Sequence, residues 1–384
     1  MKIARITPLT YTPGHLEYFS FIRGGIGADY HQEPRFEQFA DGEVMLRWAA
    51  YDFDECSGNA VKLYSVSKDR GLTWSDPQLF MADYAGGVPY FMLSLRLQGT
   101  NNALMLFTRT RHAPIEEDEE RRVITAGSDY FQSQTRLFLR RSTDGGRTYD
   151  HGEELPYGLV GGGKELPGVG FYGSGDELIQ LRSGRIVAAF TFMDPALSDP
   201  ATGHQHYTGA CLLSDDGGRT WRRSGEITVD TLRGVMELQI AETEPDRLFC
   251  LFRTKGGYVY QTVSEDGGET WSASVPSPLT APESMTRMIR LRSGNLLAVW
   301  NNVSSVTQQP RHPLAAAISK DGGCSWEPPK IIADETGENQ LSNHGVIQLD
   351  DGRILLGISH YRATRPMCSD LDLAIFDEEW LSDN

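Results

Sequence analysis

Short apolar stretches separated by tight turn pairs recur along the whole chain. A typical unit is Leu178–Leu181, the turn pair Ser183-Gly184 and a second apolar run at Ile186–Phe190. Runs of this length bounded by Gly, Asn, Asp and Ser predict β-hairpins. The six turn pairs are Asp41-Gly42, Asn101-Asn102, Ser183-Gly184, Pro245-Asp246, Ser293-Gly294 and Asp351-Gly352. Helix-period segments of useful length are missing, so we expect an all-β protein.

A second pattern, S-x-D-x-G-x-T/S-aromatic, follows each of the first five hairpins. An Asp and a Gly at these positions favour a tight turn, because Asp accepts hydrogen bonds from its own turn and Gly adopts a positive φ at little cost. Calcium binding is the alternative, but each copy has too few carboxylates at the wrong spacing for a calcium loop. The five copies lie at residues 67–74, 142–149, 214–221, 264–271 and 319–326.

Six hairpins in phase with a turn motif predict a six-bladed β-propeller, formed as a single domain by residues 1–384. Each blade buries its hydrophobic faces only against its neighbours, so the ring has to close. We expect a closing blade that combines the strand Leu371–Phe376 with the N-terminal segment Ile3–Phe21. Two jelly-roll sandwiches are an alternative, but they do not explain the phase of the two patterns.

Composition narrows the possible partners. The 384 residues include 36 Lys+Arg and 52 Asp+Glu, a net charge of −16, and no block of five basic residues, which argues against nucleic acid. No apolar run approaches the roughly 18 residues of a membrane span. The five cysteines are scattered without a C-x-x-C pair, and His204-Gln205-His206 is only a weak metal signal, so we expect no metal and no cofactor. Residues 1–8 lack the apolar core of a secretory signal, so we expect a cytoplasmic protein.

The S-x-D-x-G-x-T-W repeat resembles the Asp-box of the sialidase superfamily, the BNR-repeat neuraminidase-like propellers, and the resemblance extends over nearly the whole chain. The end Phe376–Leu381 also resembles the closing strand of bacterial sialidases. The resemblance implies a carbohydrate partner and an exo-acting glycosidase that removes a terminal acidic sugar, such as sialic acid. The Asp-box itself also occurs in proteins without catalysis, so function has to be argued from the site.

Candidate site residues precede the turn pairs, where the inner strands of a propeller converge on its axis. Charged side chains in otherwise apolar strands are costly to bury without partners or a wet cavity, which favours a functional role. These candidates are Gln32, Glu33, Arg35, Tyr90, Asp176, Glu177, Glu237, Arg287, Asn343 and His344.

Blade order assigns family roles to some of these positions by resemblance. Sialidases bind the substrate carboxylate with three arginines, because planar guanidinium groups match a carboxylate. Arg253 and Arg311 fall where the second and third arginines are expected. Glu237 falls at the glutamate that polarises the family's nucleophile, and Asp52 or Asp54 falls in the stretch of the acid/base aspartate.

Two positions depart from the family. The first arginine belongs to an Arg-Ile-Pro segment, which here reads Gln32-Glu33-Pro34, so Arg35 and Arg287 are the candidates for a third substrate-binding arginine. The tyrosine nucleophile belongs where this chain reads Ser342-Asn343-His344-Gly345, and Tyr361 lies on the following strand.

Three functions remain open from the sequence. In the first, a hydrolase, Asp52 or Asp54 is the acid, Glu237 acts directly as base or nucleophile, and Gln32, Asp176, Glu177 and Asn343 contact the sugar. In the second, a polysaccharide lyase, a neutral side chain removes the proton beside a uronate carboxylate; the candidates are His344, His31, His204, His206 and Tyr361. The third is a carbohydrate-binding propeller without catalysis. The sugar, its linkage, the stereochemical outcome and the oligomeric state are not determined by the sequence.

Overall fold

The computed structural model describes residues 11–23, 30–51, 60–82, 88–114, 128–161, 173–303, 311–363 and 368–382. Within these ranges the chain forms 24 strands and two helices of five residues each. Antiparallel sheets of four strands account for most of the fold, in agreement with the predicted all-β class. No helix in the described ranges has the length and apolar character that crossing a bilayer requires.

Four blades are separate four-stranded sheets whose strands follow chain order. Blade two contains β6 (Val88–Arg96), β7 (Ala103–Pro114), β8 (Ser128–Ser142) and β9 (Glu153–Glu154). Blade three contains β10 (Gly173–Gln180), β11 (Ile186–Met193), β12 (Tyr207–Ser214) and β13 (Arg222–Arg223). Blade four contains β14 (Met236–Glu244), β15 (Arg247–Arg253), β16 (Tyr258–Ser264) and β17 (Val275–Thr280). Blade five contains β18 (Arg287–Arg290), β19 (Leu296–Asn301), β20 (Leu314–Ser319) and β21 (Lys330–Ala333).

The remaining two blades carry the closure of the ring. Blade one contains β2 (Tyr30–Gln38), β3 (Val44–Tyr51), β4 (Ala60–Ser67) and β5 (Gln78–Ala82). Blade six contains β22 (Gln340–Gln348), β23 (Ile354–Arg362), β24 (Cys368–Phe376) and, from the other end of the chain, β1 (Glu17–Ile22). β1 pairs antiparallel with β24, so the predicted closing blade of both chain ends is confirmed over the described residues. A single parallel pair, Tyr30 with Ser369, links the sheets of blades one and six.

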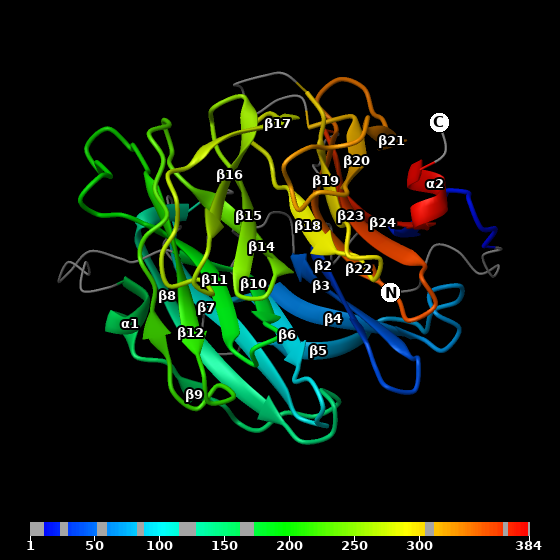
Figure 1. Ribbon diagram of the computed structural model, residues 1–384, viewed down its shortest axis with the longest axis horizontal. Helices are drawn as coiled ribbons and strands as arrows, with labels where there is room; N and C mark the ends of the chain where they lie inside the picture. The colour runs from blue at the N-terminus through cyan, green and yellow to red at the C-terminus, as the bar shows by residue number, and fades with distance from the viewer. Residues whose placement is uncertain are drawn as a thin grey trace, which may run out of the picture.

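Hydrophobic clusters fill the interfaces between neighbouring blades and close the ring. Leu104, Leu139, Ile186 and Phe190 pack between blades two and three, and similar clusters occupy the next interfaces along the chain. Blade six packs on blade one through a cluster that includes Trp48. A smaller cluster joins blades one and two. Each blade therefore buries both faces only in the assembled ring, which Figure 1 shows with the first strands meeting near the middle of the molecule.

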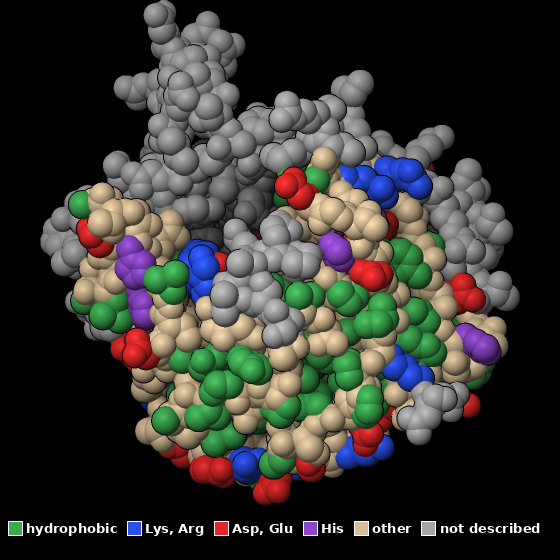
Figure 2. All heavy atoms as spheres, turned by 90° about the horizontal axis from the view of Figure 1, so that it is seen from above, with side chains coloured by type: hydrophobic (Ala, Val, Ile, Leu, Met, Phe, Trp, Pro, Cys, Tyr) green, Lys and Arg blue, Asp and Glu red, His purple; other side chains and the backbone are tan. Residues whose placement is uncertain are grey.

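Antiparallel pairing places the chemistry-bearing ends of the first strands on one face and the tight turns on the other. The turns between first and second strands, and those between third and fourth strands, lie on one side, which we call the turn face. The starts of the first strands lie on the opposite side, which we call the entry face. In the edge-on view of Figure 2, acidic and basic side chains gather along one edge, and hydrophobic side chains spread over the middle of the described surface.

The S-x-D-x-G turns are closed by their own side chains. In the first copy Ser67 donates to Asp69 at 2.8 Å, and the backbone N–H of Gly71 donates to Ser67 at 2.7 Å. Thr73 donates to Asp69 through both its N–H and its hydroxyl, and the Trp74 indole donates to the carbonyl of Gly71. The other four copies repeat the Ser–Asp and Gly–Ser bonds. The carboxylate is satisfied inside its turn, which supports the structural role over calcium binding.

The C-terminal end differs from the expected closing strand. β24 ends at Phe376, and α2 (Glu378–Ser382) follows, so the expectation of a strand over Phe376–Leu381 is wrong. The reason is Asp377, which accepts a hydrogen bond from the backbone N–H of Trp380 at 2.8 Å and thereby caps the helix. The other short helix, α1, spans Tyr157–Gly161 between blades two and three.

Candidate functional site

The first strands of five blades are interrupted by a bulge at an equivalent position. A bulge inserts an extra residue and re-aims the neighbouring side chains. In three of these bulges a residue other than Gly has a positive φ: 58° for Glu33, 56° for Glu237 and 44° for Asn343. Such conformations are uncommon, cost free energy and cluster at functional sites. The register shifts lie between Gln32 and Arg35, Tyr90 and Leu93, Gly175 and Glu177, Met236 and Gln239, and Ser342 and Gly345.

Blade four brings Glu237 and Arg253 together. Arg253 Nη1 lies 3.0 Å from Glu237 Oε1, and their side chains are 10% and 17% exposed. The other oxygen of Glu237, Oε2, is buried and has no hydrogen-bond partner among the described residues. One oxygen of this carboxylate is therefore fixed, and the second is available to a ligand or to water.

Arg253 also faces a second carboxylate, Glu283, which the sequence did not single out. Glu283 is 1% exposed and lies 3.6 Å from Arg253 Nη2, 2.5 Å from Arg233 Nη1 and 3.7 Å from Lys255 Nζ. The five groups carry three positive and two negative charges. Glu283 precedes the inner strand β18 by only a few residues, but its partners lie 28 to 50 residues away, and no local pattern reveals such a pairing.

Arg287, at the start of β18, joins four blades at the axis. Its Nε donates to the carbonyl of His344 at 2.8 Å. Its Nη1 donates to the side chain of Gln239 at 3.0 Å and to the carbonyl of Asp176 at 3.3 Å. Burial and the neighbouring charge of Arg35 lower the pKa of Arg287 to about 9, against the opposing effect of nearby carboxylates. Arg287 is 4% exposed and holds the inner strands together at the base of the site.

Arg35 and Glu177 lie within electrostatic reach of each other and of Arg287. Burial lowers the pKa of Arg35, and the carboxylates of Glu177, Glu33 and Asp176 oppose this shift. Burial raises the pKa of Glu177, and Arg287 and Arg35 oppose that shift. A carboxyl group with a raised pKa retains its proton to higher pH, as general acids require.

Asp176 fixes the bulge that presents Glu237. The Asp176 carboxylate, 2% exposed, accepts a hydrogen bond from the backbone N–H of Leu238 at 3.1 Å. Leu238 directly follows Glu237 in the chain. Asp176 thus forms a structural link between blades three and four, and the predicted sugar contact at Asp176 stays a prediction.

The bulges of blades one and six are tied together by Ser359. Its hydroxyl accepts from the N–H of Glu33 at 3.3 Å and donates to the carbonyl of Asn343 at 3.2 Å. The Glu33 carboxylate pairs with Lys62 at 2.9 Å. Asn343 is therefore held in its left-handed conformation next to blade one.

The candidate histidines of these strands are enclosed in the structure. His344 is 0% exposed, and its Nε2 lies 2.8 Å from the carbonyl of Val299. Burial, with Arg287 and Arg35 nearby, lowers the pKa of His344 to about 3, so the ring is neutral. His31 is also 0% exposed and accepts from the Trp48 indole at 3.1 Å. The proton-transfer role predicted for His344 therefore stays a prediction, for a ring that is enclosed in this structure.

The other predicted site residues are Gln32, Arg311 and the aspartates 52 and 54. The side chain of Gln32 is 4% exposed. The carbonyl of Arg311 accepts from the N–H of Leu341 at 3.0 Å and from the side chain of Asn301 at 2.8 Å, so the Arg311 backbone lies beside the first residues of β22. Asp52 and Asp54 lie outside the described residues. No group of three or more His, Cys, Asp or Glu side chains is arranged to hold a metal ion in the ranges that the structure describes.

A family model of BNR repeat-like domains matches residues 93–356. A sialidase of Bacteroides fragilis is 26% identical over 211 residues, which cover 53% of this chain and 36% of the relative. A sialidase of Micromonospora viridifaciens is 23% identical over 352 residues, which cover 83% of this chain and 49% of the relative. The chain thus spans half or less of the length of these curated relatives.

Solved structures of similar fold include sialidases. The NanB sialidase from Streptococcus pneumoniae superposes with a TM-score of 0.69 at 14% identity, covering 95% of this chain and 71% of that one. The intramolecular trans-sialidase from Ruminococcus gnavus gives 0.68 at 15% identity, covering 94% and 98%. A protein of unknown function from Dyadobacter fermentans gives 0.70 at 19% identity, covering 95% and 100%. At these identities the likeness establishes the sialidase-type propeller fold.

Proposed function

Because the chain belongs to the BNR repeat-like domain family of the sialidase superfamily, we propose that it is a glycoside hydrolase that removes a terminal acidic sugar from a glycan. The observation that carries the proposal is the geometry of Glu237. Its carboxylate sits at a strained bulge, is held through one oxygen by Arg253 and leaves the other oxygen without a partner among the described residues. Such a pre-positioned carboxylate is what glycoside hydrolysis requires of its base or nucleophile.

Arg253 and Arg311 are the proposed contacts to the substrate carboxylate, with Arg35 adding positive charge at the axis. Charge-assisted bonds from planar guanidinium groups suit a sugar acid. This local positive charge contrasts with the net charge of −16 of the whole chain. The preference for an acidic over a neutral sugar therefore has to come from these few side chains.

The proposed reaction does not pass through a tyrosyl intermediate, because the stretch where the resemblance places that tyrosine reads Ser342-Asn343-His344-Gly345 in this chain. Glu237 either attacks the anomeric carbon or removes a proton from the attacking water, and an acid protonates the leaving oxygen. Asp52 or Asp54 is the proposed acid by chain order. Glu177 is the competing candidate, because burial raises its pKa.

The test is hydrolysis of aryl glycosides of sialic acid, glucuronic acid and galactose by the purified chain. We expect turnover of an acidic sugar and a loss of at least about 100-fold in kcat/KM for Glu237→Gln, the magnitude of removing a positioned acid-base group. Glu244→Gln is the matched control, because Glu244 is an exposed glutamate at the other end of the same strand.

The alternatives give different results in the same experiment. An ultraviolet-absorbing unsaturated product from a uronate oligosaccharide would identify a lyase. Saturable binding without turnover of any glycoside would identify a carbohydrate-binding propeller. Full activity of Glu237→Gln would show that Glu237 is not the base or nucleophile.

A further inference from the structure

An equivalent position near the end of each first strand, on the turn face, forms a ring around the axis. In each blade, this position directly precedes the first residue of the turn between the first and second strands. Four of the six side chains there are amides or carboxylates, and two are arginines: Gln38, Arg96, Gln180, Glu242, Arg290 and Gln348.

The four acceptor side chains bind the turn of the preceding blade. Gln180 accepts from the N–H of Gln98 at 2.8 Å, and Glu242 accepts from the N–H of Arg182 at 3.0 Å. The same bond joins Gln348 to the N–H of Arg292 at 2.7 Å, and Gln38 to the N–H of Asp350 at 2.8 Å. The position is thus a repeated link between neighbouring blades.

Arg96 and Arg290 break this repeat, because a guanidinium has no acceptor. They belong to blades two and five, which are three blades apart and hence on opposite sides of a six-bladed ring. Neither side chain forms an ion pair or a hydrogen bond with a residue that the structure describes. At these two positions the link between blades is lost, and no hydrogen bond or ion pair with a described residue replaces it.

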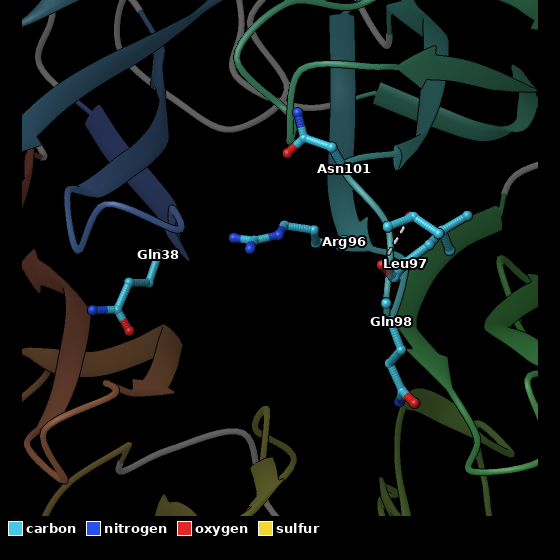
Figure 3. Close-up of a pocket in the computed structure, with 7 residues that line it drawn as sticks. Gln38, Arg96, Leu97, Gln98 and Asn101 are labelled. Atoms are coloured by element: carbon cyan, nitrogen blue, oxygen red, sulfur yellow. Dashed lines mark hydrogen bonds between the residues drawn. The ribbon is translucent and has the colours of Figure 1, made fainter.

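Arg96 instead points into an open cavity. The cavity has a volume of about 530 Å³ and is lined by Gln38, Arg96 and the turn 97–101. Figure 3 shows the guanidinium of Arg96 extending from β6 into the central space, with Gln38 on its far side. A volume of this size is within the range of small-molecule sites.

Asp350, the carboxylate bound by Gln38 across the cavity, does not neutralise the charge of Arg96. Gln38 binds Asp350, but that carboxylate pairs with Arg70 at 2.9 Å. An unpaired guanidinium presents donors that match a carboxylate or a phosphate. Beside Leu97 and Gly99, the lining includes the polar residues Gln98, Thr100 and Asn101, which suit hydroxyl groups.

We propose that this cavity binds a small hydroxylated anion, a sugar acid or a sugar phosphate, with its oxyanion on Arg96. The site is on the turn face and is separate from Glu237, which lies toward the entry face. Arg290, the equivalent residue of blade five, is exposed on the opposite side of the ring and is not among the residues that line the cavity. The proposal does not depend on the hydrolase activity.

The test is isothermal titration of the whole chain with D-glucuronate, D-glucose 6-phosphate, inorganic phosphate and D-glucose. We expect one or both sugar anions to bind more tightly than inorganic phosphate, and no binding of glucose. Arg96→Gln should weaken the binding at least tenfold. The same variant should unfold at an unchanged or higher temperature, because glutamine is the residue of three other blades and can accept from the N–H of Ala40.

Two control variants make the result specific. Arg219→Gln removes the same charge from an exposed turn of the same face and should bind like the wild type. Glu244→Gln changes an exposed carboxylate outside both proposed sites and should also bind like the wild type. The proposal is overturned if the wild type binds neither sugar anion, if Arg96→Gln binds as well as the wild type, or if either control loses binding equally.

Discussion

Glu237 and Arg253 form an ion pair at 3.0 Å between neighbouring strands of blade four, and the same guanidinium lies 3.6 Å from Glu283. Arg253 is therefore held between two carboxylates. One of them is itself bound by Arg233, so the orientation of the pair is set from outside the blade. This arrangement pre-positions Glu237 before any substrate arrives, which is how enzymes reduce the cost of organising a reaction.

Replacing Arg253 should destabilise the protein more than replacing an exposed arginine. Arg253→Gln leaves Glu237 and Glu283 without their shared cation in a mostly buried place, and the free energy of unfolding should fall by about 3 kcal/mol. Arg247→Gln is the control, since its pair with Glu265 is exposed and should contribute less than about 1 kcal/mol. Urea unfolding measures both, and equal losses would contradict the central role of Arg253.

Removing the hydroxyl that joins blades one and six should also cost stability. Ser359→Ala leaves the N–H of Glu33 and the carbonyl of Asn343 without their bridge, a loss of about 1–2 kcal/mol. Ser382→Ala, at an exposed hydroxyl, should change the free energy of unfolding by less than about 0.5 kcal/mol. If the two variants unfold at the same urea concentration, the bridge does not contribute.

The buried neutral His344 should make the fold sensitive to acid. The pKa of His344 is about 3 in the folded protein, below its value near 6.5 in the unfolded chain, so the unfolded chain binds more protons between these limits. Stability therefore falls as pH drops below about 6.5, by at most about 1.4 kcal/mol per pH unit from this group. His344→Gln should flatten the dependence of the unfolding free energy on pH between 6 and 4.

Glutamine is chosen because its amide can still donate to the carbonyl of Val299. His15→Gln, at an exposed position, tests whether the loss of any histidine has the same effect. An unchanged slope in His344→Gln would show that other groups cause the acid sensitivity.

Asp377 should stabilise both chain ends together. Its carboxylate accepts from the Tyr11 hydroxyl, from the N–H of Gly14 and from the N–H of Trp380. Burial alone would raise the pKa of Asp377, but these hydrogen bonds outweigh it and lower the pKa. The stabilisation is therefore present above the unfolded pKa near 4 and is lost as pH falls.

Asp377→Ala should lower the free energy of unfolding at pH 7 by about 2 kcal/mol. Hydrogen exchange at the amides of Gly14 and Trp380 should accelerate, because both lose their acceptor. Protection equal to that of the wild type at both amides would contradict the role of Asp377. The resemblance to a closing strand did not reveal the link to Tyr11 and Gly14, because these two partners lie at the other end of the chain.

The sequence by itself determined the repeat, and hence the number of blades and their closure by both ends of the chain. Turn chemistry is local, because the bonds among Ser67, Asp69 and Gly71 join residues two and four positions apart. A pattern in one sequence is therefore sufficient to predict the turn. Blade order in turn placed Glu237 and Arg253 on adjacent strands of one blade.

Only the tertiary structure decided the surroundings of the candidate residues. His344 and Asp176 stand in the same sequence context as Glu237, but ring closure encloses His344 and directs Asp176 to the N–H of Leu238. The local sequence does not predict that Glu283 lies beside Arg253, or that Arg96 points into the central cavity. The positions of these charges depend on which blades become neighbours and how the first strands bulge toward the axis. Both are properties of the closed ring, because burial and electrostatic partners arise only when distant segments pack together.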